Sequence, residues 1–218
     1  MSSPAERRQT VLDGIARAAE VAGRDPADVQ LIAVSKGRRV EEIEPLIEAG
    51  QRDFGENRVQ EALEKWPALQ ARYPDVRLHE IGRLQSNKAA EAVKLFDAIH
   101  SIDRTSLLEA LVKEAEKAGR HPGVYVQVNI GEEEQKGGCA IGGFGGLVDA
   151  VRASPLPLAG LMAIPPLGPE PGPYFALLAK IARSHDVTGL SIGMSGDFQA
   201  AIMLGATAVR VGTALFEN

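Results

Sequence analysis

The stretch LIAVSK, residues 31–36, is an apolar run that ends on a single lysine. It is too short for a helix and is typical of a buried parallel strand, which would deliver the amine of Lys36 to the edge of a sheet. A lysine there is costly to bury unless its charge is paired or its proton removed. A desolvated lysine beside other cations, here Arg38 and Arg39, is the type that forms Schiff bases. Lys36 is therefore a candidate covalent site, with a solvated loop lysine as the alternative.

Helical and strand patterns alternate along the chain on either side of this stretch. Helices are predicted from a capping box at residues 3–6 to a stop at Gly23, and then around residues 43–47, 59–65, 86–95, 106–118, 142–151, 174–184 and 198–204. Besides the first strand, strands are predicted at residues 52–55, 78–82, 98–102, 124–130, 158–164, 190–192 and 208–211. The order begins with a helix and ends near the eighth strand.

Alternation on this scale implies parallel strands joined by right-handed helical crossovers, and eight of each close into a barrel. We expect one (β/α)8 barrel over residues 1–218, in which the first helix fills the gap left by a missing helix after the last strand. A doubly wound open sheet is the alternative, but the GxGxxG turn that it needs after its first strand is absent. No linker, low-complexity run or short repeat divides the 218 residues, so a second domain is not expected.

Composition and charge limit the function classes. Hydrophobic residues make up 44% and charged residues 24%, as in an ordinary globular protein, and the net charge of -5 gives no broad attraction to nucleic acid or anionic membrane. The one cysteine, Cys139, allows no internal disulfide, and the sequence has no apolar signal core or membrane-spanning run. We expect a cytoplasmic protein without nucleic-acid or membrane partners, in which a local site holds any bound phosphate.

Polar and small residues stand at the predicted carboxyl ends of the strands, where the loops of such a barrel form one mouth. Reading off these ends gives Lys36, Asn57, Gly82, His100, Asn129, Met162, Ser195 and Arg210. After the seventh strand, residues 191–197 offer backbone N–H groups and the Ser195 hydroxyl to an anion, with Asp197 as a first-turn or cap residue rather than a ligand. After the eighth, Gly212 offers bare backbone and Thr213 a hydroxyl. These two turns predict a phosphate subsite, and a plain serine-capped helix is the alternative for the first.

The strand position of Arg210, between two valines, predicts that its side chain points into the barrel mouth. An interior ion pair with a carboxylate such as Glu56 is the alternative. The four histidines are scattered, without HExxH spacing or cysteine companions, so no metal site is predicted. His100 stands near a strand end, where we expect a structural hydrogen bond.

The chain resembles a known family over about residues 29–216. The blocks that carry the resemblance are VSKG at 34–37, FGENRVQE at 54–61, IGRLQSNK at 81–88, IHSID at 99–103, QVNI at 127–130, GLMAIPP at 160–166, GMSGDFQAAI at 193–202 and VRVGTALF at 209–216. Together and in this order they resemble the pyridoxal 5′-phosphate homeostasis proteins, the YggS/PROSC family. The resemblance implies a monomeric or weakly associating single-domain barrel of the alanine racemase N-terminal type that carries pyridoxal phosphate as a Schiff base.

The resemblance also implies roles for individual residues. Lys36 matches the Schiff-base lysine, Ser195, Gly212 and Thr213 match phosphate contacts, and Arg210 matches the arginine that faces the pyridine nitrogen. The implied cofactor-binding set is Lys36, Asn57, Met162, Ser195, Arg210, Gly212 and Thr213. An arginine at the ring nitrogen disfavours a protonated pyridinium and makes the ring a weaker electron sink. Two departures are Gly37, where the family more often has a larger residue, and the early stop at Asn218.

The leading functional hypothesis is a non-catalytic protein that stores, buffers or hands over pyridoxal phosphate, with pyridoxal-phosphate-dependent apoenzymes as candidate recipients. The alternative is a small racemase-like enzyme that uses the same cofactor. Such racemases complete their site with a second domain and a tyrosine from a partner chain, whereas none of Tyr73, Tyr125 and Tyr174 stands clearly at a strand end. A third class, a cofactor-free lysine aldolase, would use the paired turns for a sugar phosphate.

Overall fold

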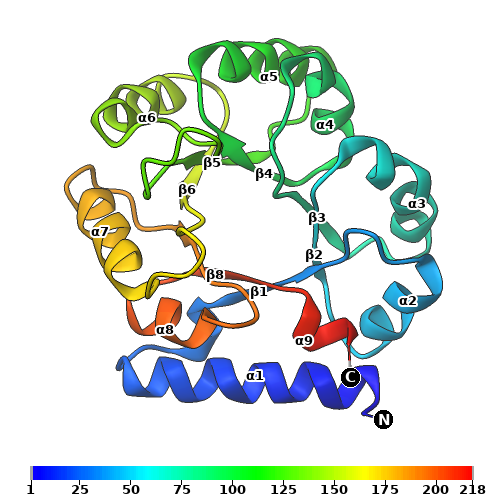
Figure 1. Ribbon diagram of the computed structural model, residues 1–218. Coiled ribbons are helices and arrows are strands. Elements are labelled where there is room, and N and C mark those ends of the chain that lie inside the picture. The colour runs from blue at the N-terminus through cyan, green and yellow to red at the C-terminus, as the bar shows by residue number, and fades with distance from the viewer. Residues whose placement is uncertain (1, 218) are drawn as a thin grey trace.

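In the computed structural model, which describes residues 2–217, eight parallel strands form a closed barrel in the order β1 to β8 (Figure 1). The strands are β1 (Gln30–Val34), β2 (Asp53–Glu56), β3 (Arg77–Glu80), β4 (Ala98–Ile102), β5 (Gly123–Gln127), β6 (Leu158–Met162), β7 (Leu190–Ser191) and β8 (Ala208–Val211). β8 pairs with β1 and closes the ring, with Ile32 opposite Arg210. The predicted (β/α)8 barrel is confirmed, and the open-sheet alternative is wrong.

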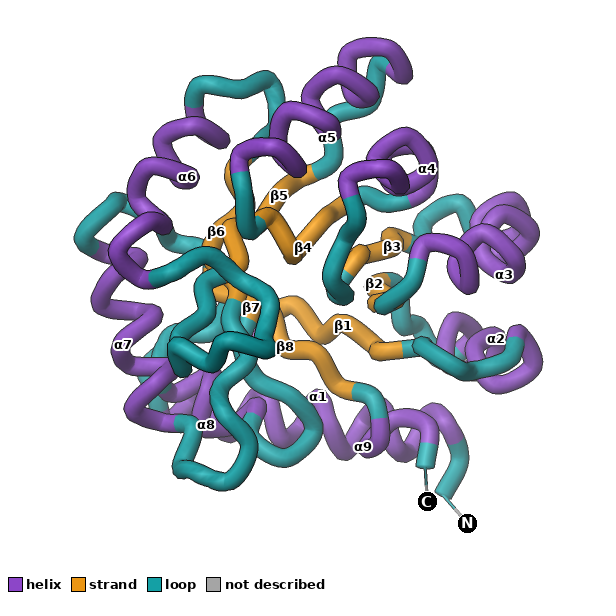
Figure 2. The backbone as a smooth tube through the Cα atoms, turned by 45° about the horizontal axis from the view of Figure 1, so that its top comes forward, coloured by secondary structure: helices purple, strands orange, loops and turns teal. Residues whose placement is uncertain are grey.

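Helices surround the strands on all sides, as the tube in Figure 2 shows. They are α1 (Pro4–Val21), α2 (Val40–Glu48), α3 (Val59–Arg72), α4 (Ala89–Leu95), α5 (Thr105–Ala118), α6 (Phe144–Arg152), α7 (Gly172–Arg183), α8 (Phe198–Met203) and α9 (Thr213–Phe216). Three short 3-10 helices, η1 (Pro26–Asp28), η2 (Ser86–Lys88) and η3 (Ile141–Gly143), lie in the connections.

Helix α1 begins with the predicted capping box. The Ser3 hydroxyl accepts from the backbone N–H of Glu6 at 3.2 Å, and the Glu6 carboxylate accepts from the backbone N–H of Ser3 at 2.7 Å. α1 lies beside α8 and α9 and covers the β1–β8 side of the barrel, as expected (Figure 1). The expectation that no helix follows the last strand is wrong, because the one-turn helix α9 comes directly after β8.

Several predicted boundaries differ from the structure, among them the ends of α3, β5 and β6. α3 continues seven residues beyond the predicted end at residue 65, because Trp66 and Leu69 are buried on its inner face and Pro67 is accommodated within it. β5 ends at Gln127 rather than at residue 130, because the next residues pair with a loop: the N–H of Asn129 donates to the carbonyl of Cys139. β6 ends at Met162 rather than at residue 164.

The main apolar core lies between the outer face of the strands and the inner faces of the helices. Phe54 on β2 and Trp66 on α3 are both fully buried, and their ring centroids lie 5.1 Å apart. Large aromatic side chains supply much of the burial energy of such a layer. The strand ends that form the mouth are therefore held by packed walls. Between residues 2 and 217, no helix has both the length and the hydropathy that crossing a membrane requires.

Candidate functional site

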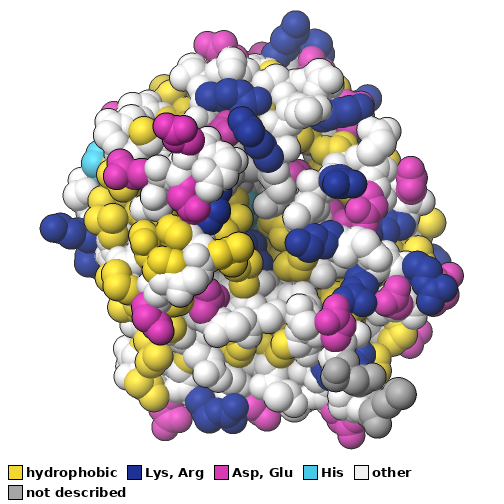
Figure 3. Space-filling model, in the orientation of Figure 1, with side chains coloured by type: hydrophobic (Ala, Val, Ile, Leu, Met, Phe, Trp, Pro, Cys, Tyr) yellow, Lys and Arg dark blue, Asp and Glu magenta, His cyan; other side chains and the backbone are white. Residues whose placement is uncertain are grey.

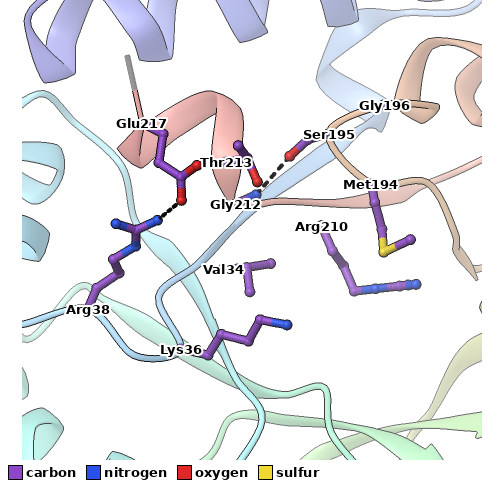
Figure 4. A pocket seen from close by; sticks show the side chains of 10 residues that line it. All are labelled: Val34, Lys36, Arg38, Met194, Ser195, Gly196, Arg210, Gly212, Thr213 and Glu217. Carbon is purple, nitrogen blue, oxygen red and sulfur yellow. Dashed lines mark hydrogen bonds and ion pairs between the residues drawn. The ribbon is translucent and has the colours of Figure 1, made fainter.

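A cavity of about 300 Å³ opens at the carboxyl ends of β1, β7 and β8 (Figure 4). The space-filling view in Figure 3 shows a hollow at the centre of this face of the barrel, with Lys and Arg side chains around it. The residues that line the cavity are Val34, Lys36, Arg38, Met194, Ser195, Gly196, Arg210, Gly212, Thr213 and Glu217. The fold thus brings Lys36 to the same space as the two predicted turns.

Lys36 lies two residues beyond β1, and its amine points into the cavity (Figure 4). Its side chain is exposed. The expectation that the amine of Lys36 is desolvated is therefore wrong. The strand ends at Val34, and Lys36 lies in the exposed loop at the rim of the cavity. Its placement at the end of the first strand is nevertheless as predicted, and the amine is free to meet a ligand in the cavity.

Helix α3 holds the loop that carries Lys36. The ammonium group of Lys65 donates to the carbonyl oxygens of Ser35 at 2.9 Å and Arg38 at 3.2 Å. The N–H of Gly37 donates to Glu61 on the same helix at 2.5 Å. Gly37 has a φ of +68°, a left-handed conformation that favours glycine, so its N–H reaches Glu61 without strain. The backbone on both sides of Lys36 is thus anchored from one helix.

The turns after β7 and β8 meet at Ser195 and Gly212. The N–H of Gly212 donates to the Ser195 hydroxyl at 3.2 Å (Figure 4). Gly193, with a φ of +92°, begins the β7 turn, and a Cβ there would lie 2.6 Å from the Cβ of Ala201. Asp197 is the N-cap residue of α8, as predicted, and its carboxylate accepts from the N–H of Met194 at 2.5 Å. Asp197 therefore shapes the turn that presents Ser195.

Arg210 lies on the inner side of the barrel wall and is 4% exposed. Its guanidinium donates to the carbonyl oxygen and the hydroxyl of Ser191, both at 2.6 Å, and to the carbonyl oxygen of Ala163 at 3.1 Å. No carboxylate within residues 2–217 forms an ion pair with it. Burial lowers the pKa of Arg210 to about 10, so the guanidinium stays cationic at neutral pH.

The alternative partner for Arg210, Glu56, lies on the opposite face of the sheet. Its carboxylate accepts from the Ser35 hydroxyl at 2.6 Å and from the Trp66 indole at 2.9 Å, and it pairs with Lys65 at 2.8 Å. Successive strand residues point to opposite faces, and Glu56 faces the helices while Arg210 faces the interior. The alternative interpretation, an ion pair between Glu56 and Arg210, is therefore wrong.

Two residues of the predicted set do not line this cavity. Asn57 lines a neighbouring cavity of about 290 Å³ beside α3 and η2, together with Arg58, Val59, Gln60, Glu80, Arg83, Leu84, Gln85 and Lys88. Met162 is fully buried at the end of β6, opposite Gln127 and Ser191 in the neighbouring strands. Contact of Asn57 or Met162 with a cofactor stays a prediction.

Several residues that line the cavity are not in the predicted cofactor-binding set. Arg38 forms an ion pair with Glu217 at the rim, although the two are far apart in the chain (Figure 4). Met194 and Gly196 flank Ser195 in the turn after β7. The two arginines shortly after Lys36 indicate that a cation such as Arg38 lies near the cavity. Nothing in the sequence near Glu217 indicates that this residue pairs with Arg38.

Residues 12–217 match the family of the alanine racemase N-terminal domain. The chain is 43% identical to the pyridoxal phosphate homeostasis protein of Pseudomonas aeruginosa, covering 99% of this chain and 96% of that protein. It is 38% identical to the protein of the same name from Escherichia coli K12, covering 99% and 97%. These matches define the class as a barrel of the alanine racemase N-terminal type.

Solved structures agree with these relatives. The structure of PipY from Synechococcus elongatus with pyridoxal phosphate bound superposes with a TM-score of 0.79 at 40% identity, covering 93% of this chain and 99% of that one. An alanine racemase from Corynebacterium glutamicum shares the fold, with a TM-score of 0.66 at 22% identity over 94% of this chain and 60% of that one. The chain belongs to the family of pyridoxal phosphate homeostasis proteins.

Proposed function

We propose that this protein binds pyridoxal 5′-phosphate in the cavity between β1 and β8 and acts in the homeostasis of this cofactor. The observation that carries the proposal is the convergence of Lys36, Arg210 and the Ser195–Gly212 contact on one cavity of a chain that belongs to this family. A cavity of about 300 Å³ with a few converging polar groups is typical of a small-molecule site.

The amine of Lys36 is the proposed covalent anchor. The Nζ atom would attack the aldehyde carbon of the cofactor to form a C=N bond, and the aldehyde oxygen would leave as water with both amine protons. Its exposure supports this role, because an open amine needs no rearrangement to reach a ligand. The hydrogen bonds that Lys65 and Glu61 form with the backbone of Ser35 and Gly37 would hold Lys36 at the mouth of the barrel.

The turns after β7 and β8 are the proposed phosphate subsite. Ser195 and Thr213 each offer a hydroxyl. The backbone of Gly196 is open to a ligand, because no other atom lies within 4 Å of the position that a Cβ would take there. A phosphate oxygen could take over the N–H of Gly212 from the Ser195 hydroxyl. The donor set suits a phosphate monoester, which accepts hydrogen bonds from backbone N–H groups and hydroxyls.

Arg210 is the proposed partner of the pyridine nitrogen. When bound, the cofactor supplies an electron-accepting ring, and a cationic guanidinium opposite its nitrogen disfavours the protonated form that accepts electrons best. None of the three tyrosines lines the cavity: Tyr125 is 7% exposed inside the barrel, Tyr73 caps α3 and Tyr174 lies in α7. Both features favour a carrier without substantial catalysis over a racemase-like enzyme.

We further propose that the carrier acts as a monomer in the cytoplasm and that pyridoxal-phosphate-dependent apoenzymes receive the cofactor from it. The exposure of Lys36 at an open rim supports transfer, since release needs only attack of water or another amine on the C=N bond. The net charge of -5 gives no general attraction to nucleic acid.

An absorbance spectrum of the purified protein, recorded with added cofactor before and after borohydride, tests the proposal. We expect a visible band that borohydride removes, with the reduced label on Lys36 alone by peptide mass spectrometry. Lys36→Ala should lose the band and keep its circular dichroism spectrum, and Lys88→Ala, in the neighbouring cavity, is the matched control. A reducible band that survives in Lys36→Ala would refute this assignment and point first to Lys88.

A further inference from the structure

A continuous chain of buried hydrogen bonds crosses the barrel interior and ends on Arg210. The guanidinium donates to the Ser191 hydroxyl, which lies 2.9 Å from Nδ1 of His100. Nε2 of His100 lies 3.0 Å from Nδ1 of His79, and Nε2 of His79 lies 3.0 Å from a carboxylate oxygen of Asp53. All five residues are less than a tenth exposed. The chain therefore links the mouth to a carboxylate at the start of β2.

The two ends of the chain have fixed roles in hydrogen bonding. The Asp53 carboxylate only accepts, so Nε2 of His79 donates to it. Arg210 only donates, so the oxygen of the Ser191 hydroxyl accepts from it. The two histidine rings connect these ends through the His79–His100 and His100–Ser191 contacts.

The surroundings of the chain set the charge of Asp53 and of His100. Asp53 also accepts from Arg77 at 2.7 Å and from Gln30 at 2.8 Å. Burial raises its pKa, but the hydrogen bonds from His79 and Arg77 outweigh this and hold the pKa below its usual value. Burial, with the charges of His79 and Arg210, lowers the pKa of His100 well below its usual value and keeps the ring neutral.

Two other groups face the ends of the chain. The ring of Tyr125 stacks on His100 with centroids 4.1 Å apart and fixes its plane, and burial raises the pKa of the Tyr125 hydroxyl. The charge of Asp197 acts on Arg210 from the β7 turn and favours the cationic guanidinium. Both groups are compatible with a neutral His100 and a charged Arg210.

We propose that His79 and His100 are positioning residues for Arg210, and that the hydrogen-bonded chain through them to Asp53 orients the guanidinium toward the pyridine nitrogen of the bound cofactor. This rests on the proposed function, which assigns that nitrogen to Arg210. Three of the five guanidinium N–H groups are used by Ser191 and Ala163, which leaves two for a ligand at the mouth. The hydrogen bonds of the chain hold the side of the guanidinium that faces the barrel interior. The carboxylate of Asp53 lies at the far end of the chain, so it does not contact the guanidinium directly and does not compete with the ligand for its N–H groups.

The test separates the chain from cofactor binding by two measurements. First, ¹⁵N NMR of the histidine rings in the protein without ligand should show that Ser191→Ala shifts the signals of His100 and His79, because the chain connects both rings to Ser191. Second, Ser191→Ala and His100→Phe should weaken cofactor binding by about tenfold, the usual effect of a hydrogen bond to a charged group. The same variants should shift the ring-nitrogen signal of ¹⁵N-labelled pyridoxal phosphate.

Ser101→Ala is the matched control, because Ser101 is a buried serine of the same barrel that donates to Glu80 outside the chain. It should leave both the histidine signals and the ring-nitrogen signal unchanged. Histidine signals that do not shift in Ser191→Ala overturn the proposal, even if the cofactor does not bind. Equal affinity and ring-nitrogen signal in Ser191→Ala and Ser101→Ala overturn it as well. Ser191→Ala removes a single oxygen, so it keeps the test valid if His100→Phe fails to fold.

Discussion

The ammonium group of Lys65 lies 2.9 Å from the carbonyl oxygen of Ser35, so a buried lysine on α3 holds the backbone directly before Lys36. The same ammonium group pairs with the fully buried carboxylate of Glu56 at 2.8 Å. One side chain thus links the wall of the barrel to the loop of the proposed covalent anchor.

Replacing Lys65 with methionine should destabilise the protein by about 3–5 kcal/mol, because it leaves the charge of Glu56 buried without its partner. Urea unfolding measures the change. The double variant Lys65→Met/Glu56→Gln should recover part of the loss, since it removes the unpaired charge. A single variant within about 1 kcal/mol of the unaltered protein would contradict the inferred role of this pair.

Pyridoxal without its phosphate should bind far more weakly than pyridoxal phosphate. The predicted contacts at Ser195, Gly212 and Thr213 are charge-assisted hydrogen bonds, which contribute about 1.5–3 kcal/mol each. Titration followed by absorbance gives both affinities. Ser195→Ala should reduce the difference between the affinities for pyridoxal phosphate and pyridoxal. Comparable affinities for the two ligands in the unaltered protein would rule the phosphate subsite out.

Glu80 should make stability fall as the pH rises. Burial raises its pKa from 4.5 to about 8, against hydrogen bonds from Ser101 and the backbone of Gly82 that lower it. The folded protein therefore holds a proton that the unfolded chain loses above about pH 4.5, so the favourable contribution is full below that pH and is lost as the pH approaches 8.

Urea midpoints measured at pH 5 and pH 8 reveal this loss. Glu80→Gln, which cannot ionise, is the comparison, and its midpoint should change less over the same interval. The prediction is wrong if the two proteins lose the same stability between these pH values.

The protein should show no substantial racemase, transaminase or decarboxylase turnover on common amino acids. Racemisation needs an electron sink and a positioned base on each face of the substrate. Among the described residues that line the cavity, Lys36 is one candidate base, and the other, Glu217, is held in an ion pair with Arg38. Exchange of the Cα hydrogen in deuterated water, with saturating cofactor, is the measurement. Exchange with racemisation at about 1 per second or faster would favour the enzyme over the carrier.

The alternation of patterns predicted the barrel because local propensity and the closed sheet agree along nearly the whole chain. The end of α3 was missed because a proline two residues after Lys65 usually ends a helix, whereas burial of Trp66 and Leu69 continues this one. The helix α9 was missed because four residues carry no periodic signal.

The candidate site was predictable where strand ends define it, as for Lys36, Ser195 and Arg210. It was not predictable where partners come from distant segments. The His79–His100–Ser191 chain joins β3, β4 and β7, and no spacing in the sequence reveals which histidines share the interior. The exposure of Lys36 depends on where β1 ends, and strand ends are the least certain part of a sequence prediction.

The cavity straddles the seam at which the barrel closes, because Lys36 follows β1 while Arg210, Gly212 and Thr213 belong to β8 and the residues just after it. During synthesis Lys36 emerges well before Arg210, Gly212 and Thr213. The proposed site is therefore complete only after the segment from β1 to β8 has left the ribosome and β8 has paired with β1. Binding of the cofactor at the proposed site would then require a closed barrel, and the bound cofactor would stabilise that barrel by mass action against opening between β1 and β8.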